Sequence, residues 1–89
     1  MKLDDIRRSI DETDDELLAL FLRRMALSEQ VAKCKLESGL PLENKEREKQ
    51  ILDHVSRKAG ENGQYARRLF SVLFELSKEK QSQLMAKER

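Results

Sequence analysis

Several charged and polar side chains of this 89-residue sequence fall where a helical pattern calls for apolar ones. Arg24 lies between Leu20 and Leu27 in an a/d-like apolar series, and a buried guanidinium without an anionic partner is energetically costly. Lys35 follows about three helical turns later and therefore shares a face with Arg24. A single cation at such a position commonly snorkels or pairs with an internal acid. Two cations on one strip instead indicate a site for a small anion.

The last part of the chain shows the same kind of interruption. Ser77 and Gln81 continue the helical spacing of the apolar residues before them, which places two polar side chains within an apolar face. Either residue alone would be interpreted as one half of an interhelical hydrogen bond, because buried polar groups are normally paired. Together with Arg24 and Lys35, they predict one polar pocket.

A third polar group, Asn44, Arg47 and Glu48, follows the only proline of the chain. Asn44 and Glu48 share a helix face with Ile51, and Arg47 lies one turn before Ile51. The same residues also fit an ordinary helix start, with Asn44 as the N-cap and the other two in a solvated first turn. Both interpretations stay open at the level of sequence.

The sequence lacks the residues that covalent or metal-dependent catalysis needs. A single histidine, His54, and a single cysteine, Cys34, provide no zinc set, no Cys/His pair and no Ser-His-Asp triad. No glycine-rich phosphate loop is present, and His54 lies in a charged stretch typical of a helix surface. We therefore expect no metal and no cofactor. The remaining Arg, Lys, Ser, Gln and Glu side chains suit binding of a small dianion and stabilisation of charge.

Three helices must position these side chains. The only proline and all three glycines fall within residues 39–41 and 60–63, which divide the chain into three uninterrupted segments. We predict a single all-α domain over residues 1–89, with helices at about 4–37, 44–59 and 64–87.

The first of these helices predicts a second copy of the chain. Its apolar face persists from Leu3 to Val31, yet a helix over 4–37 is about 50 Å long, whereas a globule of this chain length is about 30 Å across. Two shorter helices cannot cover that face, so we expect an intertwined homodimer with two-fold symmetry. Arg7 lies about 25 Å along the axis from Arg24. If Arg7 reaches the pocket, it therefore comes from the partner chain.

Composition narrows the possible partners. Hydrophobic residues make up 38% and charged residues 39% of the chain, with a net charge of +1. There is no basic block and there are few aromatic residues to stack bases, so we expect no nucleic-acid partner. No apolar run is long enough for a membrane span or a signal peptide, and the lone cysteine fits a reducing compartment. These features predict a cytoplasmic protein with no membrane contact.

The motifs carry a family resemblance over nearly the whole chain. They are Ile6-Arg7, Ile10-Asp11, Asp14, Leu17-Leu18-Ala19-Leu20, Arg24 and Lys35, then Pro41, Asn44 and Arg47-Glu48, and finally Arg68-Leu69-Phe70, Ser77 and Gln81. In order and spacing they resemble the AroQ class of chorismate mutases, of the all-helical, monofunctional type. Each fragment is weak alone, because amphipathic helices are rich in Leu, Arg and Glu. Eight polar positions at family spacing form a specific pattern.

The resemblance implies that the chain converts chorismate to prephenate in the biosynthesis of phenylalanine and tyrosine. This pericyclic rearrangement of a small dianion needs no nucleophile, metal or covalent intermediate. It needs a compact substrate conformer and stabilisation of the negative charge that develops on the ether oxygen.

The resemblance also implies a role for each polar residue. Arg24, together with Arg7 of the partner chain, would bind the two carboxylates, and Ser77 would assist at the ring carboxylate. Lys35 and Gln81 would donate hydrogen bonds to the ether oxygen. At the start of the second helix, Glu48 would hold the ring hydroxyl with help from Asn44. Arg47 would orient Glu48 or add positive potential. Asn44 departs from members of the family that carry Asp at this position.

Two other functions fit the same residues. An isochorismate-pyruvate lyase would share the fold and most of the pocket, and it also proceeds without covalent catalysis. A non-enzymatic dimerisation module would use the polar residues in its apolar faces only to specify register.

Overall fold

The protein is all-helical in the computed structural model, which describes residues 2–41 and 43–87. The elements are α1 (Leu3–Ser38), α2 (Lys45–Lys58), the single 3-10 turn η1 (Gly60–Asn62) and α3 (Gly63–Lys87). The predicted all-α class with three main helices is confirmed. The observed helix ends lie within one residue of those expected from the sequence.

The connection between α1 and α2 follows the local chemistry of its residues. Gly39 ends α1 in a left-handed conformation with φ of 69°, which glycine adopts without the steric cost of a Cβ. Asn44 begins α2, and its side-chain oxygen accepts a hydrogen bond from the backbone N–H of Arg47 at 3.1 Å. Acidic Glu46 and Glu48 in the first turn suit the positive end of the helix dipole.

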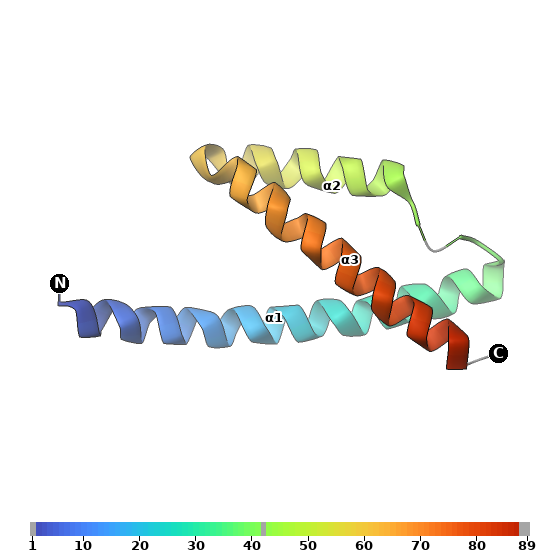
Figure 1. Cartoon of the computed structure of the whole chain (residues 1–89), viewed down its shortest axis with the longest axis horizontal. Coiled ribbons are helices and arrows are strands. Elements are labelled where there is room, and N and C mark those ends of the chain that lie inside the picture. The colour runs from blue at the N-terminus through green and yellow to red at the C-terminus, as the bar shows by residue number, and fades with distance from the viewer. Residues whose placement is uncertain (1, 42, 88–89) are drawn as a thin grey trace.

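The two shorter helices form a hairpin that leans on one half of α1. In Figure 1, α2 and α3 are joined through η1, and α3 crosses the half of α1 that leads to its C-terminal end, while the first half of α1 extends away from both. At the tip of the hairpin, Gly63 is buried, and a Cβ there would lie 2.8 Å from the backbone oxygen of Ser56. The close approach of α2 to α3 therefore requires glycine at position 63.

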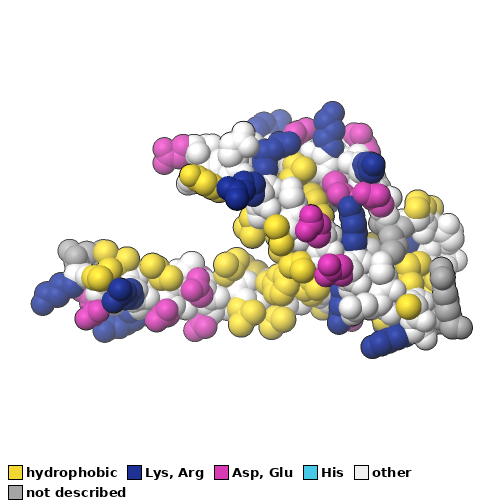
Figure 2. Space-filling view, in the orientation of Figure 1, with side chains coloured by type: hydrophobic (Ala, Val, Ile, Leu, Met, Phe, Trp, Pro, Cys, Tyr) yellow, Lys and Arg dark blue, Asp and Glu magenta, His cyan; other side chains and the backbone are white. Residues whose placement is uncertain are grey.

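The single chain buries very little apolar surface. Ala32 and Phe74 are the buried hydrophobic residues of the described chain, whereas Leu17, Leu18 and Leu20 are each more than half exposed. Figure 2 shows hydrophobic side chains following α1 into the half that no other helix covers. The longest dimension of the chain is 54 Å, which matches the length expected for the first helix. One chain thus leaves uncovered the face that the sequence assigned to a homodimer.

Among the residues that the structure describes, no helix combines the length and the apolar character that crossing a membrane requires.

Candidate active site

A pocket of about 340 Å³ lies between the three helices. This volume is at the lower end of the range found for small-molecule sites. The predicted residues that line it are Arg24, Lys35, Asn44, Arg47, Glu48, Ser77 and Gln81. Arg7 does not line this pocket; it is exposed on the first half of α1, within the stretch that the other helices leave uncovered. That location agrees with its expected distance from Arg24 along the helix.

Arg24 projects from α1 toward α3 and is half-buried. Its Nη1 donates a hydrogen bond to the Ser77 hydroxyl at 2.7 Å, and its guanidinium carbon lies 5.7 Å from the centre of the Phe74 ring. No acidic side chain of the described chain forms an ion pair with Arg24. Desolvation by burial lowers the pKa of Arg24 from its ordinary value, yet a guanidinium stays charged at neutral pH. A cation without a carboxylate partner therefore faces the pocket.

Two serine hydroxyls fix the position of this cation. The hydroxyls of Ser28 and Ser77 are hydrogen-bonded at 3.0 Å, and Ser28 also lies 3.1 Å from the backbone oxygen of Arg24. Both serines are buried, with 7% of each residue exposed. These contacts link α1 to α3 in the wall of the pocket, which both serines line, and they hold the guanidinium in place without a ligand.

Lys35 and Gln81 border the same pocket from α1 and α3. Gln81 follows Ser77 by one helical turn and is only 7% exposed, whereas Lys35 is half-buried. Both side chains carry N–H donors, and the amide of Gln81 donates irrespective of pH. The pocket therefore combines the Arg24 guanidinium with further N–H donors from α1 and α3, and such groups can bind a carboxylate or donate to an oxygen that carries negative charge.

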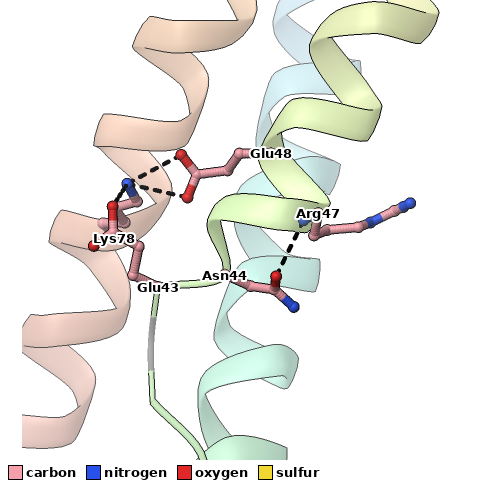
Figure 3. A network of polar contacts seen from close by, with 5 residues as sticks. All are labelled: Glu43, Asn44, Arg47, Glu48 and Lys78. Atoms are coloured by element: carbon pink, nitrogen blue, oxygen red, sulfur yellow. Dashed lines mark hydrogen bonds and ion pairs between the residues drawn. The ribbon is translucent and has the colours of Figure 1, made fainter.

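The start of α2 forms the remaining wall. Glu48 is half-buried and lines the pocket, and Asn44 uses its side-chain oxygen to cap the helix. Arg47 is exposed, and in Figure 3 its side chain points away from Glu48. No ion pair joins Arg47 to Glu48 in the described chain. The structure thus shows Arg47 as a source of positive charge at the pocket and shows no contact by which it orients Glu48.

The contact to Glu48 comes instead from Lys78, which the sequence analysis did not single out. The Nζ atom of Lys78 lies 3.1 Å and 3.2 Å from the two carboxylate oxygens of Glu48 and 3.0 Å from Oε1 of Glu43. Lys78 also lines the pocket. Its position, one turn after Phe74 and adjacent to Ser77, could have indicated this face. The alternating charges of residues 78–80 instead resemble an exposed helix surface.

The described residues offer no cluster for a metal ion, and the single histidine lies outside the pocket. Among the residues described, no group of three or more His, Cys, Asp or Glu side chains could hold a metal ion. His54 is exposed on α2 and does not line the pocket, as its charged neighbours indicated.

Comparisons with known proteins relate this chain to chorismate mutases. The family model described as chorismate mutase type II matches residues 6–82. A chorismate mutase of Methanocaldococcus jannaschii is 34% identical over 87 residues, which cover 94% of this chain and 88% of that protein. A bifunctional chorismate mutase/prephenate dehydratase of Aquifex aeolicus is 32% identical over 56 residues, which cover 63% of this chain and 16% of that protein.

A solved structure shares the arrangement of the helices. It is a conserved hypothetical protein from Pyrococcus furiosus, 33% identical in sequence, with a TM-score of 0.71. The match covers 89% of this chain and 93% of the other.

Proposed function

The chain belongs to the chorismate mutase type II family, and we propose that its pocket rearranges chorismate to prephenate without a covalent intermediate. Its activity is that of an isomerase, at the branch toward phenylalanine and tyrosine. The observation that carries the proposed mechanism is the charge of the pocket: four cationic side chains and one carboxylate line it, and Arg24 has no acidic partner in the described chain. Such a lining favours a small dianion.

Substrate binding depends on two arginines in this proposal. Arg24 binds one carboxylate, and the hydroxyl of Ser77, already hydrogen-bonded to Arg24, assists at the ring carboxylate. Arg7 of a second copy binds the other carboxylate. Because the rearrangement requires the substrate to fold onto itself, holding both of its charged ends selects the reactive conformer.

Lys35 and Gln81 act on the ether oxygen. Negative charge develops there as the C–O bond breaks, and preorganised N–H donors stabilise that charge more than they stabilise the ground state. A preorganised donor of this kind contributes about 3 kcal/mol, so two donors and conformational restriction together reach the roughly 8 kcal/mol expected of a modest enzyme. No nucleophile or metal is needed for this step.

The first turn of α2 binds the ring hydroxyl. Glu48 accepts a hydrogen bond from the hydroxyl, and the start of the helix at Asn44 assists. Since the side-chain oxygen of Asn44 already caps α2, the groups left to reach substrate are its side-chain amide and the backbone N–H groups of the helix start. Arg47 adds positive potential at the pocket.

A homodimer supplies the missing arginine. The exposed apolar face of α1 supports this assembly, because 40% of Ile6, 51% of Ile10 and 54% of Leu17 remain exposed in the single chain. Ile6 and Ile10 flank Arg7, and Leu17 continues the same exposed stretch, so a second copy that covers the face also brings an Arg7 side chain toward a pocket. In this assembly residues 1–89 act as one domain, in the cytoplasm, where a reducing compartment keeps Cys34 as a thiol.

The direct test is to incubate the purified protein with chorismate and follow its disappearance and the appearance of prephenate. Formation of prephenate supports the proposal. Inertness toward chorismate combined with pyruvate release from isochorismate would identify the lyase of the same fold, and inertness toward both would leave a dimerisation module.

The shared site is tested with mixed dimers. Arg7→Ala and Lys35→Ala are expected to inactivate the protein separately, since each removes one group from every site. Mixed dimers of the two variants contain one site with both defects and one site with neither, so activity should return toward half of the wild-type value per mixed dimer. Absence of recovery despite measured subunit exchange would contradict a site built from two chains.

A further inference from the structure

Lys78 of α3 binds two carboxylates at the start of α2. Figure 3 shows its ammonium group between the side chains of Glu43 and Glu48, the first in the connection to α2 and the second in the first turn of that helix. Glu48 and Lys78 line the pocket, whereas Glu43 does not. One ammonium group therefore joins a pocket carboxylate to a carboxylate outside the pocket.

This contact matters for the shape of the pocket because α2 has no direct backbone packing with α1. In the described chain, α1 packs against α3 and α2 packs against α3, while α1 and α2 do not approach one another closely. The position of Glu48 relative to Arg24 therefore depends on how both helices pack on α3, besides the chain connection between α1 and α2. The polar links on α3 are neighbours in sequence, with Ser77 bound to Arg24 and Lys78 bound to Glu48.

The ion pair between Lys78 and Glu48 also changes the charge of the pocket in which a dianion would bind. An unpaired carboxylate at position 48 would repel the negatively charged ligand that the rest of the pocket attracts. The ammonium of Lys78 lies close to both carboxylate oxygens, which offsets their charge and restricts the side chain to one orientation. Each carboxylate oxygen has more than one acceptor site, so Glu48 can still accept a hydrogen bond from a hydroxyl.

We propose that Lys78 is a positioning residue of the chorismate site, one that aims Glu48 at the substrate hydroxyl and cancels its charge toward the dianion. This role rests on the proposed function of Glu48. It differs from stabilisation of the fold, because partly exposed ion pairs such as this one contribute little to the free energy of unfolding. Hydrogen bonds to Glu43 and then to Glu48 raise the pKa of Lys78, so its ammonium stays charged at neutral pH.

The test compares substitutions at two lysines of α3. Lys78→Met removes the charge at the pocket, and Lys78→Arg keeps it. Lys80→Met is the matched control, because Lys80 forms an ion pair of the same kind with Glu29 of α1, at 3.3 Å, and does not line the pocket. The KM and kcat for chorismate and the thermal midpoint are measured for each variant.

We expect Lys78→Met to raise KM about 10-fold. This effect is smaller than the roughly 100-fold loss of rate that misplacement of a catalytic group causes. The unpaired charge acts on the ground state and the transition state alike, so KM should change more than kcat. Lys78→Arg should restore KM to within about 3-fold of wild type, and Lys80→Met should match wild type. A KM for Lys78→Met within twofold of wild type would overturn the proposal.

Coupling to Glu48 separates positioning from a structural role. In a Glu48→Gln background, Lys78→Met should change KM by less than it does in the wild-type background, because the carboxylate that it neutralises is gone. Equal changes in the two backgrounds would overturn the proposal. If Lys78→Met does not fold, Lys78→Gln replaces it in the same cycle, since it removes the charge and keeps a polar side chain.

The same assay distinguishes the two proposals. An inactive wild-type protein would contradict the proposed function, and with it the role of Lys78. An active wild-type protein with an equally active Lys78→Met variant would contradict only the role of Lys78.

Discussion

The two contacts that hold the pocket together differ in burial and in charge. Arg24, Ser28 and Ser77 link α1 to α3 through short hydrogen bonds among buried or half-buried groups. Lys78 links α3 to α2 through ion pairs whose side chains remain 24% to 50% exposed. In the first contact the cation, Arg24, is proposed to bind the substrate directly. In the second contact the cation, Lys78, is proposed to position Glu48, which binds the substrate.

This difference indicates how each contact should respond to mutation. A half-buried cation that lacks an acidic partner is available to a ligand, so its loss removes binding energy directly. An exposed ion pair is weakened by solvent and salt, so its loss changes orientation and local charge more than it changes stability. We expect the largest effect on catalysis from loss of Arg24 in the α1/α3 contact, and a smaller effect from loss of Lys78 in the α2/α3 contact.

The largest expected effect is that of Arg24→Ala. In the proposed complex Arg24 pairs with a carboxylate of chorismate. Removal of one partner from such a desolvated charge pair costs about 4 kcal/mol, which corresponds to a fall of about 1,000-fold in kcat/KM for chorismate. Arg23→Ala, at the exposed neighbouring position on α1, is the control and should retain activity. Equal losses in the two variants would show that α1 depends on its arginines for folding rather than for substrate binding.

Gln81→Glu should produce a pH dependence that the wild-type protein lacks. The wild-type amide donates at any pH, so kcat should be nearly flat around neutrality. The introduced carboxyl donates only when protonated, and burial raises its pKa. We expect a loss of about 100-fold at neutral pH, consistent with removal of one preorganised donor, and recovery as pH falls. A variant whose kcat does not depend on pH would remove Gln81 from the ether oxygen.

Ser28→Ala tests the support of Arg24 without removing the cation. It deletes one buried hydrogen bond to Ser77, which is worth about 1 kcal/mol, so kcat/KM should fall about fivefold. Ser71→Ala is the control on α3, because its hydroxyl donates a hydrogen bond to the backbone oxygen of Arg67 on an exposed surface. Steady-state kinetics of the two variants measure the difference. No change in Ser28→Ala would mean that Ser77 alone holds the guanidinium.

The smallest expected effect concerns stability at the α2/α3 contact. The hydrogen bond from Lys78 holds the pKa of Glu43 below its ordinary value. The pair therefore adds stability above that ordinary pKa, and the addition is lost as pH falls through the lowered value. Glu43→Gln should lower Tm at neutral pH by less than about 2 °C, with a shallower fall on acidification. Glu79→Gln, an exposed acid on α3, is the control. A steeper fall would contradict this assignment.

The sequence predicted one side of the pocket better than the other. Arg24, Ser77 and Gln81 interrupt apolar faces, and an interruption is visible in the helical period itself. All three line the pocket, as that pattern indicated. Lys78 gives a weaker signal. It lies one turn after Phe74, but a lysine between a serine and a glutamate is typical of a solvated face.

The spacing of residues along the sequence also did not predict which side chain contacts Glu48. Arg47 is its neighbour in sequence and was a candidate to orient it, but consecutive residues of a helix project in different directions. Lys78, 30 residues away in sequence, reaches the carboxylate instead. Pairings between helices depend on how the helices cross, and that crossing depends on packing such as the close approach at Gly63.

Local periodicity determined the helices, their ends near Gly39 and Asn44, and the polar positions in the apolar faces, because these depend on neighbours within a few turns. It also showed that α1 is too long for one chain to cover. The tertiary structure alone decided that Ser28 and Ser77 hold Arg24 and that Lys78 holds Glu48. The physical reason is that a side chain's partner on another helix depends on how the two helices cross. The spacing of apolar residues within one helix does not determine that crossing.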